Sequence, residues 1–392
     1  MRVLVAPDSY KGTLSAVTAA ELMAKALKRV QKTMEVDLAP MADGGEGTLE
    51  VLQKKLHAQV IRIHAMDAFG EPHSSYYLIQ DHTAYIELAN ICGYVPLKGS
   101  EKSKLERALQ ANTYGLGQVI LDALMRGITE IVLALGGSAS TDGGYGLLAA
   151  LGAQYLDDTD DRLSGKDARE LERVRTISLQ GVHPAVYHVN FTVLADVQNP
   201  LTGINGSATV YGPQKGLTSP EAIQKRDMEL SRFASLLENS LHISPLAQEP
   251  GMGAAGGAAL PLFAFGKATR VAGANYVAEK LEIPDRIMNA DFVITGEGQV
   301  DASTREGKVP AYMGQLASQM NKSCAVVAGR FGEGHERLFE CGVSYMVEAA
   351  PTHSEDDSPA LRLQQAVIQV AQEMIRELEH SQRTKKGDLT HE

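Results

Sequence analysis

The sequence predicts an α/β protein: a Rossmann-like, doubly wound parallel sheet domain with a second, smaller α/β domain inserted into it. Short apolar runs suited to buried strands recur along the chain, and polar or glycine-rich loops follow them. Stretches with helical apolar spacing follow several of these loops. Ligands collect beyond the carboxyl ends of the strands in such sheets, so the loops after the strands are the candidate functional segments.

The first strand–loop–helix unit illustrates the pattern. Residues 3–6 are a β-rich run, residues 7–13 carry turn-forming residues, and residues 15–30 place apolar side chains at helical spacing, with Ser15 as the expected N-cap. Later apolar runs predict further strands, and the segments between them predict helices. The expected strands include 131–135, 191–195, 292–295 and 325–328, and the expected helices include 145–151, 220–240 and 359–380.

Two regions depart from this pattern and predict the second domain. Residues 61–95 hold short alternating strands, such as 76–80 and 84–88, which look antiparallel, and residues 200–270 mix glycine-rich turns with a charged helix. We therefore predict the following division of the chain: a Rossmann-like domain over 1–60, 112–198 and 286–382, a second α/β domain over 61–111 and 199–285, and a disordered tail over 383–392.

Composition narrows the class of function. The chain has 392 residues and a formal net charge of −11, which disfavours nucleic acid and anionic membranes as partners but not a small anionic substrate. The three cysteines lie far apart and form no CxxC pair, as expected of a reduced, cytoplasmic protein. The apolar run at the N-terminus is broken at Pro7 and is too short to predict a signal peptide, and no apolar run reaches the roughly 18 residues of a membrane span. These observations do not exclude that the protein forms a homo-oligomer.

Two loops near the N-terminus combine charge with glycine. Residues 6–13, APDSYKGT, place Ser9 and Lys11 at a helix entrance, where amides, the helix dipole and an ammonium suit an anion. Residues 40–48, PMADGGEGT, place Asp43, Gly44 and Gly45 in a loop whose glycines we interpret as shaping a substrate site rather than as packing. The alternatives are an ordinary turn with an exposed lysine and a glycine-rich turn with acidic residues at a helix start.

The loop at 136–144, GGSASTDGG, is the strongest candidate for contacts to phosphate. It follows a predicted buried strand, precedes a helix, and offers Gly136, Gly137, Ser138, Ser140 and Thr141 to a nucleotide. It is not a Walker A motif, because GxxxxGK[ST] occurs nowhere in the chain.

Three further carboxylates and two lysines complete the candidates. Asp196 follows a predicted strand, where it could bind magnesium or accept a proton, and Lys215 could meet a carboxylate or phosphate. Glu297 and Asp301 lie in a glycine loop that suits a hard cation, with Lys308 shortly after. Turn or cap residues are the structural alternatives. The sequence 251–256, GMGAAG, matches G-x-G-x-x-G, but no strand is predicted before it, so dinucleotide binding is a weak alternative.

Taken in order, these segments resemble the bacterial glycerate kinase family that forms 2-phosphoglycerate. The resemblance rests on APDSYKG, PMADGGEGT, GGSASTDGG, DVQNPLTG with YGPQKG, GMGAAGG and ITGEGQVD, and extends from residue 2 to about 378. It implies ATP as donor, Mg²⁺ as cofactor, D-glycerate as acceptor, and a Rossmann-like domain joined to a smaller α/β domain.

On this basis we assign provisional roles. Lys11 would stabilise the charge of the transferred group, and Asp196 would orient or deprotonate the 2-hydroxyl. Asp43, Gly44, Gly45, Lys215 and Lys308 would bind glycerate, while Ser9 and the 136–144 loop would bind the nucleotide. Asp196, Glu297 and Asp301 are the expected magnesium ligands. A kinase for the 3-hydroxyl or another short hydroxy acid, and a non-catalytic sugar-acid sensor, stay open as alternatives.

Overall fold

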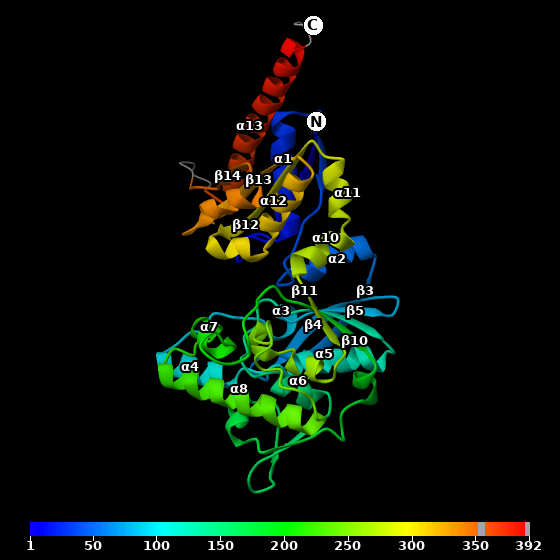
Figure 1. Cartoon of the computed structure of the whole chain (residues 1–392), viewed down its shortest axis with the longest axis vertical. Helices are drawn as coiled ribbons and strands as arrows, with labels where there is room; N and C mark the ends of the chain where they lie inside the picture. Colours follow the sequence, from blue (N-terminus) through cyan, green and yellow to red (C-terminus); the bar gives the residue numbers. More distant parts are fainter. Residues whose placement is uncertain (352–356, 389–392) are drawn as a thin grey trace. The chain divides into compact units, whose positions relative to one another are not determined.

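The computed structural model describes residues 1–351 and 357–388. The chain divides into two units, each with its own sheet (Figure 1). Unit one contains Met1–Asp43, Glu50–Lys55 and Ala274–Glu392, and unit two contains Gly44–Leu49 and Leu56–Gly273. Among the described residues, no helix combines the length and the apolar character needed to cross a membrane.

Unit one is a doubly wound domain with a five-stranded parallel sheet, as predicted. The strand order β14-β13-β12-β1-β2 places β2 on one side of β1 and the later strands on the other, so the order reverses between β1 and β12. The strands are β1 (Arg2–Val5), β2 (Glu35–Leu38), β12 (Phe292–Val300), β13 (Ser323–Phe331) and β14 (Tyr345–Glu348).

Helices cover both faces of this sheet because alternate strand residues point to opposite sides. Val3 and Val5 pack against α1 (Ala16–Val30) and α13 (Pro359–Asp388), which lie side by side in Figure 1. Leu4 faces the other layer, which consists of α10 (Gly273–Lys280), α11 (Ile283–Met288) and α12 (Val309–Gln319). The predicted Ser15 cap of α1 is confirmed, since Ser15 Oγ accepts a hydrogen bond from the Thr18 backbone N–H.

Unit two contains a six-stranded mixed sheet in the order β11-β10-β6-β5-β4-β3. The strands β5, β6, β10 and β11 are parallel, and β3 and β4 extend the sheet in antiparallel fashion, as the alternating pattern predicted. They span β3 (Gln59–Met66), β4 (Pro72–Gln80), β5 (Thr83–Glu87), β6 (Glu130–Ala134), β10 (Asn190–Leu194) and β11 (Ala268–Val271). The helices are α3 (Ala89–Cys92), α4 (Glu101–Gln110), α5 (Tyr114–Met125), α6 (Tyr145–Ala150), α7 (Ser207–Tyr211), α8 (Pro220–Leu241) and α9 (Leu260–Ala264).

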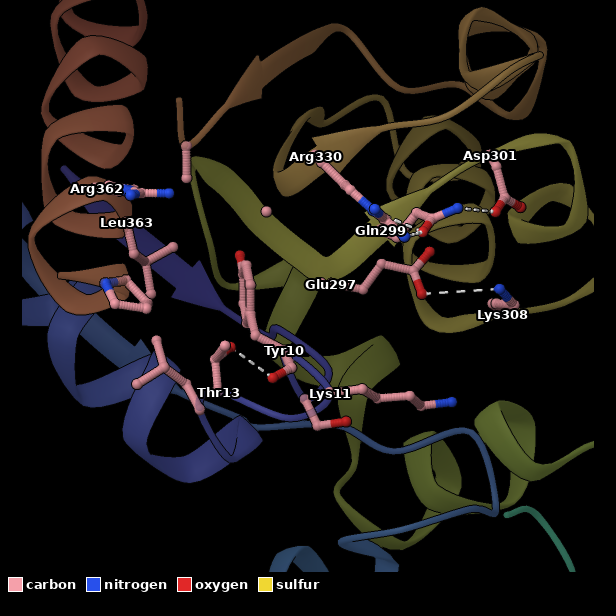
Figure 2. A pocket seen from close by; sticks show the side chains of 16 residues that line it. Tyr10, Lys11, Thr13, Glu297, Gln299, Asp301, Lys308, Arg330, Arg362 and Leu363 are labelled. Atoms are coloured by element: carbon pink, nitrogen blue, oxygen red, sulfur yellow. Dashed lines mark hydrogen bonds and ion pairs between the residues drawn. The ribbon is translucent and has the colours of Figure 1, made fainter. Parts of the chain in front are cut away.

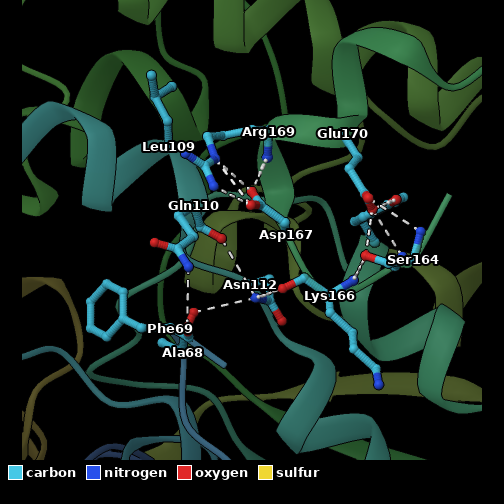
Figure 3. Close-up of polar contacts among 12 residues, drawn as sticks. Ala68, Phe69, Leu109, Gln110, Asn112, Ser164, Lys166, Asp167, Arg169 and Glu170 are labelled. Atoms are coloured by element: carbon cyan, nitrogen blue, oxygen red, sulfur yellow. Dashed lines mark hydrogen bonds and ion pairs between the residues drawn. The ribbon is translucent and has the colours of Figure 1, made fainter. Parts of the chain in front are cut away.

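A small antiparallel sheet in unit two has the order β8-β7-β9 and was not predicted. It consists of β7 (Gln154–Leu156), β8 (Arg162–Leu163) and β9 (Thr176–Ser178). Figure 3 shows how the segment after β8 is held: the Asn112 side-chain amide donates to the Lys166 carbonyl oxygen at 2.6 Å and to the Ala68 carbonyl oxygen at 3.4 Å. Asn112 thereby connects this segment to the end of β3.

The division into units differs from the predicted boundaries. Residues 112–198, assigned to the Rossmann-like domain from the sequence, lie in unit two, because β6 pairs with β5 and β10 there. Residues 274–285 lie in unit one, where Ala274 and Val277 pack under the sheet. The inserted unit is also the larger of the two rather than the smaller.

The predicted ends of two further elements are corrected. The strand expected at 292–295 continues to Val300, and the helix expected at 359–380 continues to Asp388. Residues 383–388, predicted to be a disordered tail, are therefore part of α13, and residues 389–392 lie outside the described residues. A further short parallel strand, Glu35–Leu38, was also not anticipated.

Candidate functional site

The carboxyl ends of β1 and β12 bring five predicted site residues together in unit one. Lys11, in the loop after β1, places Nζ 4.0 Å from Asp43 Oδ2. Glu297, near the end of β12, places Oε2 4.0 Å from Lys308 Nζ. The charges of Asp43 and Lys11 act on Glu297, and Ser9 precedes Lys11 in the same loop. Two lysines and two carboxylates thus gather where the strand order reverses.

Asp8 is a buried carboxylate in this group that the sequence reasoning did not single out. Its side chain is 3% exposed, and Oδ1 accepts the Ser9 backbone N–H at 2.6 Å. Burial, followed by the charge of Asp43, raises the pKa of Asp8 well above its usual value. Burial also raises the pKa of Glu297. Its position directly after a predicted strand, in the segment APD, is the sequence feature that could have identified Asp8 as a candidate site residue.

Tyr10, in the loop after β1, explains why β12 contains glycines. The sequence predicted that this strand would end before Gly296. Tyr10 Oη donates to the Val327 carbonyl oxygen at 2.7 Å and lies across β12. A Cβ added at Gly296 would lie 2.5 Å from Tyr10 Oη, and one added at Gly298 would lie 3.1 Å from the Lys11 backbone nitrogen. The glycines of the GEG segment therefore let the first loop lie against the strand and hold Lys11 beside Glu297.

Asp301 performs a structural task. Its Oδ1 accepts the Ser303 backbone N–H at 2.9 Å, and the Asp301 backbone N–H donates to Thr304 Oγ1, forming a capping box at the 3₁₀ turn Ala302–Glu306. Its Oδ2 accepts from the Gln299 amide at 2.8 Å. Both carboxylate oxygens of Asp301 therefore already have protein donors.

In unit two, the GGEGT loop, which contains Gly44, lies beside the carboxyl ends of the parallel strands, and two other predicted site residues, Gly136 and Asp196, lie at the same edge. The Gly136 backbone N–H, just after β6, donates to the Gly44 carbonyl oxygen at 3.0 Å. Asp196, just after β10, accepts the Gly273 backbone N–H through Oδ1 at 2.9 Å. A Cβ at Gly44 would lie 3.2 Å from Gly273 Cα. Glu87, at the end of β5 and not predicted as a site residue, accepts from the Gly47 and Leu49 backbone N–H groups.

Packing inside unit two accounts for the glycines of the 136–144 loop. A Cβ at Gly136 would lie 2.5 Å from Gly45 Cα, and one at Gly144 would lie 2.5 Å from Pro261 Cδ. Gly137, Gly143 and Gly144 also have positive φ angles, which L side chains rarely adopt. Gly44 and Gly45 also have close protein neighbours, since Gly45 approaches Gly136 and Gly44 approaches Gly273. Packing therefore accounts for part of the glycine content of this loop as well, and the predicted contact of Gly44 and Gly45 to a substrate stays a prediction.

Buried charges hold the 136–144 loop in place. Lys215 Nζ donates to Ser138 Oγ at 2.7 Å and to the Ser140 carbonyl oxygen at 2.6 Å. Arg226, which is 1% exposed and was not predicted, donates to the Thr141 carbonyl oxygen at 3.1 Å. Asp142, which was also not predicted, accepts the Thr113 backbone N–H at 2.9 Å and the Gly146 backbone N–H at 3.1 Å. A buried lysine and a buried arginine therefore lie directly behind this loop.

The same loop also carries unused donors. Ser140 Oγ and Thr141 Oγ1 are buried and have no hydrogen-bond partner among the described residues. Buried hydroxyls normally have partners, so two unpaired hydroxyls beside the buried Arg226 and Lys215 side chains fit an anionic ligand better than an ordinary turn. The carboxylate of a small acid and a phosphoryl group both meet this requirement.

The position of Lys215 predicts an unusual pH dependence of stability. Burial lowers the pKa of Lys215 from 10.5 to about 7, against the opposing charge of Asp142. Between these values the unfolded chain binds a proton that the folded chain has released, so the free energy of unfolding rises with pH. We expect the stability of the parent protein relative to Lys215→Met to increase from pH 7 to pH 9, by at most about 1.4 kcal/mol per pH unit.

Urea denaturation of both proteins at several pH values measures this difference. Lys102→Met, which removes an exposed lysine of α4 in the same unit, is the matched control and is expected to give a pH-independent difference. A flat difference for Lys215→Met as well would mean that Lys215 keeps its proton in the folded protein.

The residues present fit a magnesium ion only in part. Within residues 1–351 and 357–388, no group of three or more His, Cys, Asp or Glu side chains is arranged to enclose a metal. Magnesium is commonly held by one or two carboxylates together with substrate phosphates, so Glu297 or Asp196 could serve without such a cage. Asp301 fits less well, because its Oδ1 accepts the capping hydrogen bond from the Ser303 backbone N–H and its Oδ2 accepts from the Gln299 amide.

Parallel sheets with charged side chains at their carboxyl ends place this chain among the α/β proteins that bind ligands at those ends. A model of the glycerate kinase family matches residues 3–379, so the chain belongs to the glycerate kinase family. A glycerate kinase of Halalkalibacterium halodurans is 36% identical over 89% of this chain and 90% of its own length. A glycerate 2-kinase of Escherichia coli is 34% identical over 84% of this chain and 85% of its own length.

A solved structure shows the same fold. The crystal structure of the protein assigned as glycerate kinase 2 in Salmonella typhimurium is 30% identical and superimposes with a TM-score of 0.78, covering 98% of this chain and 99% of that one. The predicted α/β class and the predicted family are thereby confirmed.

Proposed function

We propose that the protein is an ATP- and magnesium-dependent kinase that phosphorylates D-glycerate at the 2-hydroxyl to give 2-phosphoglycerate. The observation that carries this proposal is the family match across residues 3–379, supported by a relative of 34% identity that is named glycerate 2-kinase. The buried, unpaired cysteines are in keeping with the cytoplasm as its compartment.

ATP with magnesium would supply the phosphoryl group and part of the charge neutralisation that its transfer requires. Lys11 would stabilise negative charge on the transferred group, since its side chain is 62% exposed and its ammonium lies near Asp43 and Glu297. Lys308 would add positive charge on the other side of Glu297. Lys11 and Lys308 are therefore the proposed charge-neutralising residues of unit one.

Asp196 would orient the glycerate hydroxyl and accept its proton, and the Gly273 backbone N–H, which donates to its Oδ1, would help to position the carboxylate. Ser140 and Thr141 would donate their unpaired hydroxyls to an anionic group of a substrate, a phosphoryl group or the glycerate carboxylate. Lys215 would act behind them by fixing the loop that carries both hydroxyls. This assignment gives Lys215 a supporting role in place of the direct contact to glycerate expected from the sequence.

The test is an assay of the purified protein with ATP, Mg²⁺ and a panel of short hydroxy acids. We expect ADP release that depends on D-glycerate and is abolished by EDTA, with a ³¹P NMR signal split by the single proton on C2 of the product. A signal split by the two protons on C3 would assign the 3-hydroxyl instead. Binding of glycerate without ADP release would favour the non-catalytic sensor.

A further inference from the structure

A cavity of about 520 Å³ lies at the carboxyl edge of the unit-one sheet, where the strand order reverses between β1 and β12. Its walls come from the loop after β1, the ends of β12 and β13, and the first turn of α13 (Figure 2). Ligands of doubly wound sheets bind at such reversal points. The volume falls in the usual range for small-molecule sites, roughly 300–1,000 Å³, and is far larger than a three-carbon acid needs.

One side of the cavity is apolar. Leu14, Ala349, Pro359 and Leu363 line it, and three of these four side chains pack with Tyr10 in a single hydrophobic cluster. Figure 2 shows Leu363 and Arg362 on the α13 side, with the Tyr10 ring between Leu363 and the charged residues near the end of β12. A flat apolar group would bury surface against these apolar side chains, and the charge of Arg362 beside them is already paired with Asp357.

The opposite side is charged and predominantly basic. Lys11, Lys308 and Arg330 line it together with Glu297 and Asp301. Asp301 is engaged in its cap, and Lys308 lies beside Glu297. Ser9 Oγ, on another wall, is buried and lacks a hydrogen-bond partner among the described residues. This side therefore offers ammonium, guanidinium and hydroxyl donors to an anionic chain.

A flat heterocycle with a polyanionic tail would match both sides of the cavity, with the heterocycle against the apolar side chains and the tail against the charged ones. By contrast, the glycines of the 136–144 loop are already occupied by protein neighbours, with Gly136 against Gly45 and Gly144 against Pro261. We infer that the nucleoside part of the nucleotide binds in the unit-one cavity, with the base toward Leu14 and Leu363 and the phosphates toward Lys11. This inference rests on the proposed function, and it places the nucleoside in a different unit from the 136–144 loop.

Photolabelling of the full-length protein with 8-azido-ATP, followed by digestion and mass spectrometry, tests the location. We expect the label on peptides that contain residues 9–14 or 359–363, with protection by ATP and no protection by D-glycerate. Label on the peptide that contains residues 136–144, or label that ATP does not prevent, would overturn the inference. Glycerate-dependent ADP release by the same preparation is measured in parallel, so that a failed location is distinguished from a failed function.

A charge reversal provides a second, independent measurement. Arg330→Glu is expected to raise the Kd of a non-hydrolysable ATP analogue about tenfold or more, because a cation that lines the cavity becomes an anion. Arg337→Glu reverses the charge of another exposed arginine of unit one outside the cavity and serves as the control, with a Kd within about twofold of the parent. Equal Kd values for both variants and the parent would count against the cavity as the nucleotide site.

Discussion

Replacing Lys11 with alanine is expected to lower kcat by about 10²–10³-fold, the usual effect of removing one group that stabilises transition-state charge. The Lys11 side chain is 62% exposed and its Nζ lies 4.0 Å from Asp43 Oδ2, an exposed ion pair of the kind that contributes little to stability. Thermal unfolding of Lys11→Ala should therefore match that of the parent. Steady-state kinetics with ATP and D-glycerate, together with a melting curve, measure both effects.

Lys32→Ala is the control for this experiment, because it removes an exposed lysine of unit one that follows the carboxyl end of α1. Its turnover should equal that of the parent, and Lys11→Arg should recover part of the lost rate since it restores the positive charge. Near-normal turnover of Lys11→Ala would remove Lys11 from the proposed mechanism.

The local elements of this fold could be read from the sequence because their signals are local. The apolar run at 131–135 became β6, and the periodic stretch that starts after Ser15 became α1, with the expected cap. The boundaries of β12 could not be read in this way. Its last five residues, GEGQV, include two glycines, a glutamate and a glutamine, and they belong to a strand only because β13 pairs with this segment and Tyr10 lies across it.

Domain membership was harder to predict because it depends on strand pairing between distant segments. Residues 112–198 share the same buried-strand pattern as unit one, yet β6 pairs with β5 and β10. A single sequence contains no signal for which of two parallel sheets a strand will join, since both require the same continuous apolar runs.

The candidate site shows the same division between local and tertiary information. Lys11, Asp43, Glu297 and Lys308 could be singled out as candidates because they lie in loops or strand ends with unusual local composition, and the structure brings them close together. Arg226 was missed because it lies within a regular charged helix, where an arginine is ordinarily exposed. Its burial behind the 136–144 loop, with a hydrogen bond to the Thr141 carbonyl oxygen, follows only from the packing of α8.

Asp196→Asn is expected to lower kcat by about 10²–10⁴-fold, the range associated with the loss of a general base. Asparagine keeps the size of the side chain and can still accept the Gly273 backbone N–H through Oδ1, so the local structure is preserved while the proton acceptor is lost. The KM for D-glycerate should change much less than kcat, since the lost interaction is with the transferring proton.

Asp227→Asn is a closely matched control, because Asp227 is also an aspartate of unit two whose Oδ1 accepts one glycine backbone N–H at 2.9 Å, that of Gly203. If Asp227→Asn retains full activity and Asp196→Asn does not, the loss reflects the position of the carboxylate rather than the amide contact that the two residues share. If Asp196→Asn instead retains turnover, then another carboxylate accepts the proton. Asp8 is the next candidate in that case, because it is a buried carboxylate directly after β1, in the same loop as Lys11, and burial raises its pKa well above its usual value.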